Sequence, residues 1–279
     1  MLRIKEGHVS RMSISRSSKG WIAAVALVGL CALQTSVLAQ QQNRSSTPAS
    51  AAALAPSWTY EGPTGALHWD RLNPAWRVCE NGKQQSPIDI HKVRLDKTLP
   101  PIQFHYLTGT MKLVNDGHTV RVTPPDGSYI TLGGVRYNLV EFHFHHPGEE
   151  VINGDISDMS VQFVHRSDDG KIVILAVELT EGNSNAILAG LWEKLPKTAG
   201  ATGTSTLMLN PVGLFPADRG YWTYTGSLTE PPCTEGVQWY VLQNPVTLSR
   251  EQLQAFAALF KRNTRTLQLT HGRHVKASE

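Results

Sequence analysis

A short run of histidine and aromatic residues carries the clearest chemistry in this sequence. It reads Glu141-Phe142-His143-Phe144-His145-His146. Alternate side chains of a β-strand share a face, so His143 and His145 would point one way and the two phenylalanines the other. Two imidazoles on one face of a rigid strand form half of a divalent metal site. The run therefore predicts a metal-binding strand; the alternative is a histidine-rich strand edge without metal.

The surrounding segments predict a β-rich domain with a few short surface helices. β-branched residues indicate strands at 111–114, 119–123, 159–165 and 172–177. Turn residues separate them at Pro124–Gly127 and Asp168–Gly170. Helices are expected at 183–195 and 249–260, and the second begins with Ser249-Arg250-Glu251-Gln252, which resembles a capping box.

The chain divides into three parts. Residues 1–39 are typical of a signal peptide, with a basic start, a short apolar run from Trp21 to Leu33 and small residues before Gln40. The alternative, an uncleaved membrane anchor, is disfavoured because that run is short for a bilayer. Residues 40–57 predict a flexible linker. Residues 58–279 are long enough for one domain with a substantial core.

Charge and cysteine content indicate an exported protein, periplasmic or secreted. The segment 1–39 holds five Lys and Arg and one Glu, so its removal changes the formal charge from +3 to −1. We find no basic stripe and expect neither a nucleic-acid partner nor a stable membrane anchor. Outside that segment, Cys79 and Cys233 remain, and outside the cytosol they most simply form one disulfide. Two free buried thiols are the alternative.

Several ordered motifs together resemble the α-class carbonic anhydrases of the bacterial, exported type. The resemblance spans about Trp58 to Val275 and implies a large twisted, mostly antiparallel ten-stranded sheet with Zn2+ at the floor of a cleft. The motifs, in chain order, are Tyr60-Glu61-Gly62-Pro63, Trp69, Gln85-Ser86-Pro87-Ile88-Asp89-Ile90, Asn115-Asp116-Gly117-His118, the histidine run, and Gly226-Ser227-Leu228-Thr229-Glu230-Pro231-Pro232-Cys233.

The family holds its zinc with three histidines, and this chain departs from that pattern at the third. The first two match His143 and His145, and the third position falls at Gln162. Glu149 precedes Gln162 by the family's interval between a buried glutamate and the third histidine. His165 is an odd number of residues from Gln162 and so faces the other side of a regular strand. A carboxamide oxygen is a weaker neutral ligand than imidazole, so we expect weakened metal retention.

The resemblance also implies a mechanism, the hydration of CO2 to bicarbonate by a zinc-bound hydroxide. Thr229 matches the threonine that accepts a hydrogen bond from that hydroxide, and Glu149 matches the carboxylate that orients it. His118 matches the histidine that passes the proton to solvent, as an imidazole can near neutral pH. Glu141 is placed to accept the free N–H of His143.

A hydrophobic wall for CO2 is also implied, although plain core packing explains the same residues. The wall positions are Val164, Ile174, Leu228 and Trp239. Glu230 stands where the family often has threonine. It either repels bicarbonate or supplies an anionic oxygen near the metal.

The leading hypothesis is a carbonic anhydrase that interconverts CO2 and bicarbonate. The main rival is a related non-catalytic domain that binds a partner or an anion through the same cleft. A carbohydrate-binding β-domain would need an aromatic platform, which we do not find in the sequence. No pattern predicts an oligomeric state.

Overall fold

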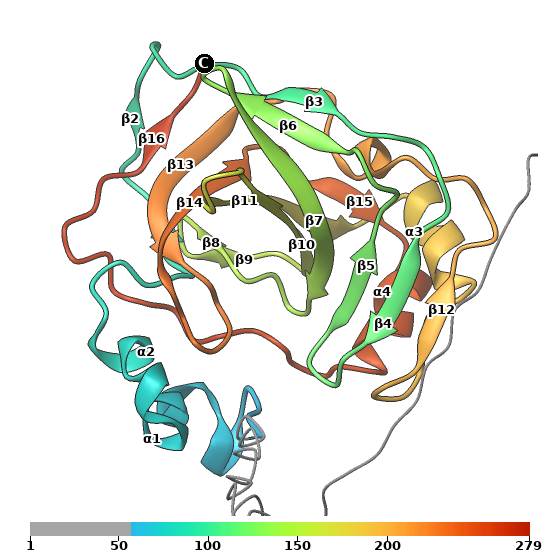
Figure 1. The fold of residues 1–279 in the computed structure, drawn as a ribbon, viewed down its shortest axis with the longest axis horizontal. Helices are drawn as coiled ribbons and strands as arrows, with labels where there is room; N and C mark the ends of the chain where they lie inside the picture. The colour runs from blue at the N-terminus through green and yellow to red at the C-terminus, as the bar shows by residue number, and fades with distance from the viewer. Residues whose placement is uncertain (1–56) are drawn as a thin grey trace, which may run out of the picture. The chain divides into compact units, whose positions relative to one another are not determined.

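The structure is a computed structural model that describes residues 57–279 of the 279-residue chain. The predicted signal peptide, 1–39, and all but the last residue of the predicted linker, 40–57, lie outside the described residues. Within 57–279 no helix combines the length and apolar character needed to cross a bilayer. The described chain is built mainly of strands (Figure 1), as the sequence patterns predict.

A large mixed sheet of 13 strands forms the body of the fold, and its main path runs through ten of them in the order β12-β4-β5-β7-β10-β11-β14-β13-β16-β2. Most neighbours on this path are antiparallel; β11 with β14 and β16 with β2 are parallel. Three further strands, β1, β8 and β9, form a small sheet of their own. The strand bounds are β1 Asp89–Ile90, β2 Arg94–Leu95, β3 Gln103–His105, β4 Lys112–Asn115, β5 Val120–Thr123, β6 Tyr129–Leu132, β7 Val135–His145, β8 Val151–Ile152, β9 Asp155–Ile156, β10 Met159–Arg166, β11 Ile172–Glu181, β12 Thr202–Thr204, β13 Tyr221–Ser227, β14 Glu235–Leu242, β15 Val246–Leu248 and β16 Lys276–Ala277.

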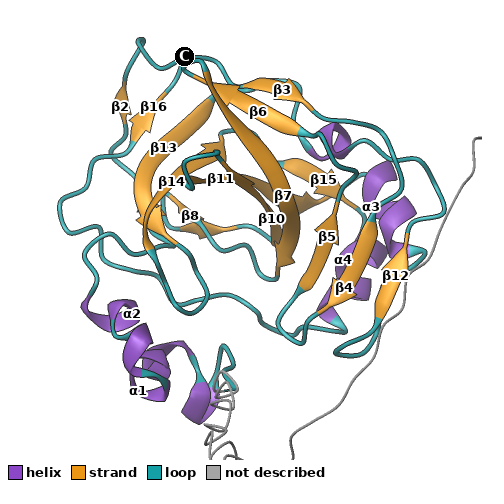
Figure 2. Ribbon diagram, viewed as in Figure 1, coloured by secondary structure: helices purple, strands orange, loops and turns teal. Residues whose placement is uncertain are grey.

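Short helices lie around the sheet, with α3 and α4 near β4 and β12 (Figure 2). The capping box predicted at the start of α4 is confirmed, because Ser249 and Gln252 exchange side-chain and backbone hydrogen bonds. Trp192 of α3 stacks on Phe256 of α4, and this contact joins the two helices. The helix bounds are α1 Trp69–Leu72, α2 Val78–Asn81, α3 Ala186–Trp192, α4 Arg250–Ala257 and the 3-10 turns η1 Gly62–Thr64, η2 Ala66–His68, η3 Pro74–Trp76 and η4 Pro211–Leu214.

Alternate side chains of the central strands point to opposite faces of the sheet, and an apolar cluster lies on each face. Phe142 and Phe144 of β7 lie in the larger cluster with Phe163 of β10. A smaller cluster lies on the opposite face of β11 and includes Ile174 and Ala176 of that strand, with Val237, Trp239 and Val241 of β14. The histidines and Gln162 alternate with the large cluster, so a polar site forms on the face that the second cluster borders.

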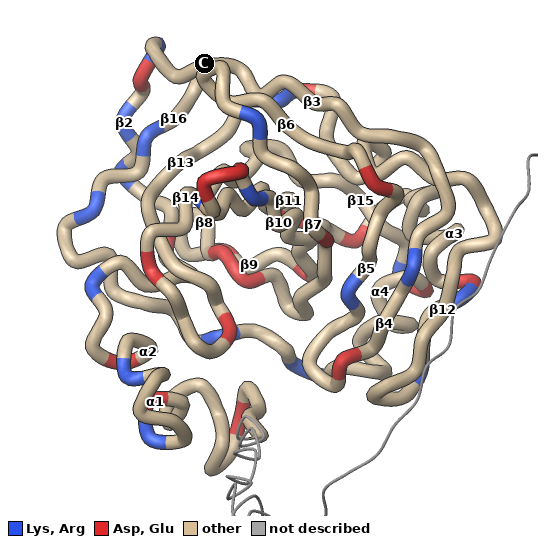
Figure 3. The backbone as a smooth tube through the Cα atoms, viewed as in Figure 1, with Lys and Arg blue, Asp and Glu red and all other residues tan. Residues whose placement is uncertain are grey.

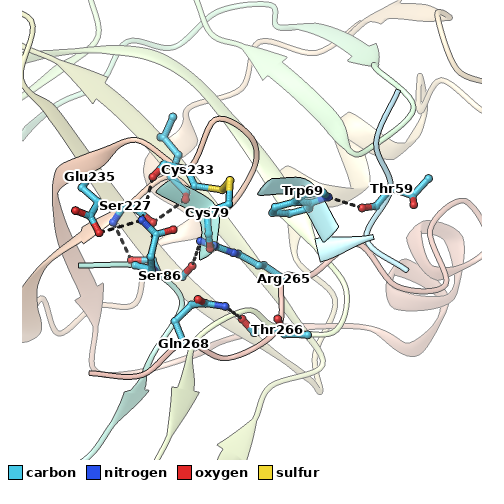
Figure 4. The surroundings of a disulfide bond; sticks show 12 residues. Thr59, Trp69, Cys79, Ser86, Ser227, Cys233, Glu235, Arg265, Thr266 and Gln268 are labelled. Atoms are coloured by element: carbon cyan, nitrogen blue, oxygen red, sulfur yellow. Dashed lines mark hydrogen bonds between the residues drawn. A yellow bond between two sulfur atoms is a disulfide. The ribbon is translucent and has the colours of Figure 1, made fainter. Parts of the chain in front are cut away.

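The predicted disulfide between Cys79 and Cys233 is confirmed, with Cα atoms 5.1 Å apart. It ties α2 to the loop that follows β13. Arg265 lies beside it and donates to the carbonyl oxygens of Cys79 and Ser86 at 2.7 and 2.8 Å (Figure 4). The disulfide therefore anchors the segment that carries Thr229 to α2, and Arg265 joins α2 to the C-terminal part of the chain.

Candidate metal and active site

His143 and His145 lie side by side on β7, with ring centroids 5.0 Å apart. Nδ1 of His145 is 2.7 Å from the carbonyl oxygen of Asn263, which can only accept, so Nδ1 carries the proton and Nε2 has a free lone pair. That Nε2 is buried and has no hydrogen-bond partner within residues 57–279. Nδ1 of His143 is 2.9 Å from the Glu141 carboxylate, which also leaves Nε2 free. Both rings thus offer the lone pair of Nε2 to a metal ion.

The environments of the two imidazoles differ. Burial lowers the pKa of His143, but the charge and hydrogen bond of Glu141 outweigh it and raise the pKa. Burial lowers the pKa of His145, which favours its neutral form. Glu141 therefore contacts the ring nitrogen that the sequence predicts, and its role in orienting a metal-binding His143 stays a prediction.

Gln162 lies on β10 directly opposite His143 of β7 and is 1% exposed. Its Nε2 donates to Oε2 of Glu149 at 2.7 Å. Its Oε1 accepts no hydrogen bond from any described residue. His165 lies on the other side of β10, fully buried, 2.6 Å from the hydroxyl of Tyr106. The parity argument against His165 as a ligand is thus consistent with the structure.

Two imidazole Nε2 atoms, those of His143 and His145, are free of hydrogen bonds to described residues on one face of β7. The buried, unpartnered Nε2 of His145 is what a divalent cation would satisfy. Residues 57–279 contain no group of three or more His, Cys, Asp or Glu residues placed to hold a metal. Gln162 lies opposite His143 at the position of the family's third ligand, and its role as a ligand stays a prediction.

Glu149 is buried behind this donor set. Its Oε1 accepts from the backbone N–H of Arg265 at 2.9 Å, and its Oε2 accepts from Gln162. Oε2 also lies 3.6 Å from Nε2 of His145. Within the described residues no hydrogen bond joins Glu149 to Thr229, so the orienting role assigned to this carboxylate stays a prediction.

Thr229 is 4% exposed and lies in the loop between β13 and β14. Two backbone bonds close that loop, from Leu228 N–H to the Thr234 carbonyl at 3.0 Å and from Cys233 N–H to the Glu230 carbonyl at 2.8 Å. The disulfide at Cys233 holds the loop's far end.

His118 lies in the turn between β4 and β5. Asp116 Oδ1 accepts from the backbone N–H of His118 at 2.8 Å, which stabilises the turn. The imidazole stacks on Trp58 with centroids 3.7 Å apart and planes 4° from parallel. Burial lowers the pKa of His118, so a neutral ring is favoured near pH 7. The stacking on Trp58 was not predicted from the sequence.

The four predicted wall residues belong to one apolar cluster. Val164 and Leu228 are partly exposed at its edge, whereas Ile174 and Trp239 are 1% and 0% exposed. Only the first two can meet a substrate without rearrangement. The other two pack behind them, as core residues do.

Two charged side chains near the site, Arg121 and Glu150, were not predicted from the sequence. Arg121 of β5 lies opposite His143 in the sheet and contacts Glu141 and Glu230. The sequence offered one indication of its role, because Arg121 is a single cation between two buried valines, Val120 and Val122. Glu150 is 1% exposed and accepts from the Tyr224 hydroxyl at 2.8 Å; burial raises its pKa well above the usual range.

Comparison with known proteins agrees with this arrangement. A model of the eukaryotic-type carbonic anhydrase family matches residues 64–279. Carbonic anhydrases of Klebsiella pneumoniae and Pectobacterium carotovorum are 37% and 36% identical, over 80% and 77% of this chain and 91% and 88% of theirs. The α-carbonic anhydrase of Thermovibrio ammonificans, solved with sulfanilamide, superposes with a TM-score of 0.77 at 37% identity, covering 79% of this chain and 99% of that one.

A β-sheet domain with a histidine-lined site is the class that the fold defines. The chain belongs to the carbonic anhydrase family. The fold and family inferred from the ordered motifs are thereby confirmed.

Proposed function

We propose that this protein catalyses the reversible hydration of CO2 to bicarbonate and a proton, with Zn2+ held by His143, His145 and Gln162. The observation that carries the proposal is the pair of imidazole Nε2 atoms left free on one face of β7, one of them buried without a partner. Family membership supports the same reaction.

Zinc, when bound, makes a water molecule acidic enough to act as a hydroxide nucleophile near neutral pH. The chain supplies the rest. Val164 and Leu228 offer the apolar surface against which CO2 can rest. Thr229 lies in a closed loop where its hydroxyl can accept a hydrogen bond from the nucleophile. His118, neutral near pH 7, can take up the released proton and give it to solvent.

Gln162 stands in this proposal for the family's third histidine. Its amide is neutral, as imidazole is, so the metal would keep its full charge and its effect on a bound water. Its weaker donation predicts faster metal loss. We further propose export to the periplasm or the medium, which the disulfide supports because such bonds persist in oxidising compartments.

The test is metal analysis followed by stopped-flow CO2 hydration on one sample of residues 58–279. We expect up to one zinc per chain when zinc is in excess, and a hydration rate above that of buffer. A rate equal to buffer in a zinc-loaded sample would contradict the proposal. His143→Ala is the control, and it should lose both metal and rate.

A second candidate, a non-catalytic domain of the same family, is favoured by the hydrogen bond from Gln162 to Glu149. That bond stabilises the pocket without any metal. Under this alternative the protein binds no zinc even in excess, and Gln162→His alone restores both binding and activity.

A further inference from the structure

Arg121 is held by three carboxylates at once. Its Nε lies 2.7 Å from Asp116 Oδ2, and its Nη1 lies 3.4 Å from Glu141 Oε1. Its Nη2 lies 2.7 and 2.6 Å from the two oxygens of Glu230. The side chains of Arg121 and Glu230 are only 28% and 26% exposed. Solvent therefore screens this pair less than it screens a fully exposed ion pair.

This ion pair joins two segments that flank the reaction centre. Arg121 is the strand neighbour of His143, and Glu230 follows Thr229 directly. The charge of Glu230 acts on both His143 and His145. An anion that forms or binds beside Thr229 therefore experiences the charges of both members of the pair.

Glu230 is turned to Arg121, and this argues against both of the roles that the sequence left open. Both of its carboxylate oxygens accept from Arg121 Nη2. The guanidinium offsets part of its charge, which weakens its repulsion of an anion, and both of its oxygens are bound by Arg121 rather than aimed at the two histidines as a metal ligand. Elsewhere in the described residues, Lys and Arg are interspersed among Asp and Glu along the backbone (Figure 3).

We propose that Arg121 and Glu230 form a charge pair that sets the affinity for small monovalent oxyanions beside Thr229 and His143. Arg121 is the specificity-determining member, because it keeps Glu230 from repelling them. The identification of bicarbonate as the natural oxyanion rests on the proposed function; the charge pair itself does not.

Substitutions on the two sides of the pair have opposite expected effects. Glu230→Gln removes one of the three negative charges around Arg121, while Asp116 and Glu141 still hold the guanidinium in place. Arg121→Gln leaves Glu230 unbalanced. A unit charge about 6–8 Å away, in surroundings between protein and water, changes anion affinity about three- to thirtyfold.

The measurement is the dissociation constant of nitrate, which has the charge and trigonal shape of bicarbonate and does not titrate. It is read from the 15N–1H signals of Thr229 and Glu230, or of the residue that replaces Glu230, in zinc-free and zinc-loaded protein. Ionic strength is held constant with gluconate. Signals of residues far from the cleft report whether each variant stays folded.

We expect nitrate to bind three- to thirtyfold more tightly to Glu230→Gln and more weakly, by a similar factor, to Arg121→Gln. The double variant should return to within about threefold of the unmodified protein. Arg121→Lys keeps the charge but not the forked geometry, and it should stay near the unmodified value. Arg250→Gln removes the cation of another arginine–glutamate pair, formed with Glu181, and should change nothing.

Equal nitrate affinities in Glu230→Gln and Arg121→Gln would overturn the proposal. So would a shift in affinity of the same sign in both variants. So would the absence of nitrate binding in every variant and both metal states. If the protein takes up no zinc, the proposed function fails separately, and the order of affinities in zinc-free protein still decides this inference.

Discussion

Nε2 of Gln162 lies 2.7 Å from Oε2 of Glu149, and this hydrogen bond fixes the orientation of the carboxamide. An ionised carboxylate only accepts, so the NH2 group must face Glu149 and the oxygen must face away. The oxygen is therefore the amide atom that Glu149 does not engage, and under the proposed function it is the atom that would bind a metal. The same bond occupies the Glu149 oxygen that also approaches His145.

Gln162→His should raise zinc affinity by at least 10–100-fold, because an imidazole replaces a weaker oxygen donor. Competition with a chromophoric chelator measures this directly. Gln162→Leu is the matched control: it keeps much of the volume, removes the donor, and should bind zinc more weakly than the unmodified chain. Equal affinity for Leu and Gln at this position would show that the amide is not a ligand.

Local periodicity was enough to predict that two histidines share one face of a strand. The two-residue repeat of β7 places His143 and His145 on one face, and the same repeat on β10 separates Gln162 from His165. The capping box of α4 is equally local. Such features depend on residues a few positions apart, and the structure confirms their placement.

Contacts between distant segments could not be read in the same way. Arg121 and Glu230 are 109 residues apart, and their contact requires both the pairing of β5 with β7 and the closed loop after β13. Trp58 and His118 meet only once the chain has folded. The resemblance named the positions of Thr229 and Glu149, but neither the Arg121 cluster nor the Gln162–Glu149 bond follows from a motif.

Glu141→Ala should weaken zinc binding about 10–100-fold, because His143 loses the carboxylate that orients its ring. Glu141→Gln keeps an acceptor at the same position and should lose much less. Zinc affinities from chelator competition give both values. Unchanged affinity in Glu141→Ala would mean that β7 packing alone orients His143.

Trp58→Ala should raise the pKa of His118 toward 6.5. Burial lowers this pKa, and the stacked indole, whose ring centroid is 3.7 Å away, is part of that burial. A titration followed by NMR on the His118 ring signals measures the shift. A fall in pKa after removal of Trp58 would mean instead that the indole stabilises the imidazolium by a cation–π interaction.

Replacing Cys79 and Cys233 together by serine should lower the free energy of unfolding by about 4–5 kcal/mol, since the disulfide closes a long loop in the unfolded chain. Urea denaturation of the double variant, compared with the oxidised parent, measures the loss. The reduced parent should resemble the variant. CO2 hydration should fall as well, because the loop that holds Thr229 loses its anchor; full activity with lowered stability would separate the two effects.

Glu178 of β11 makes the stability of the fold depend on pH. Burial raises the pKa of this carboxyl to about 8, above its ordinary value of 4.5. Its Oε2 accepts from the Ser157 hydroxyl, while its buried Oε1 has no partner in the described chain. The native state therefore holds a proton that the unfolded chain releases above pH 4.5, and the stabilisation is lost as pH rises toward 8.

Glu178→Gln keeps the neutral shape and cannot titrate, so it should remove a slope of up to about 1.4 kcal/mol per pH unit between pH 5 and 8. Urea denaturation at several pH values measures that slope. Glu181→Gln, at the exposed end of the same strand, is the control and should leave the slope in place. If Glu178→Gln instead retains the parent's slope over this range, Glu178 is ionised in the native protein and another buried acid, such as Glu150, accounts for the pH dependence.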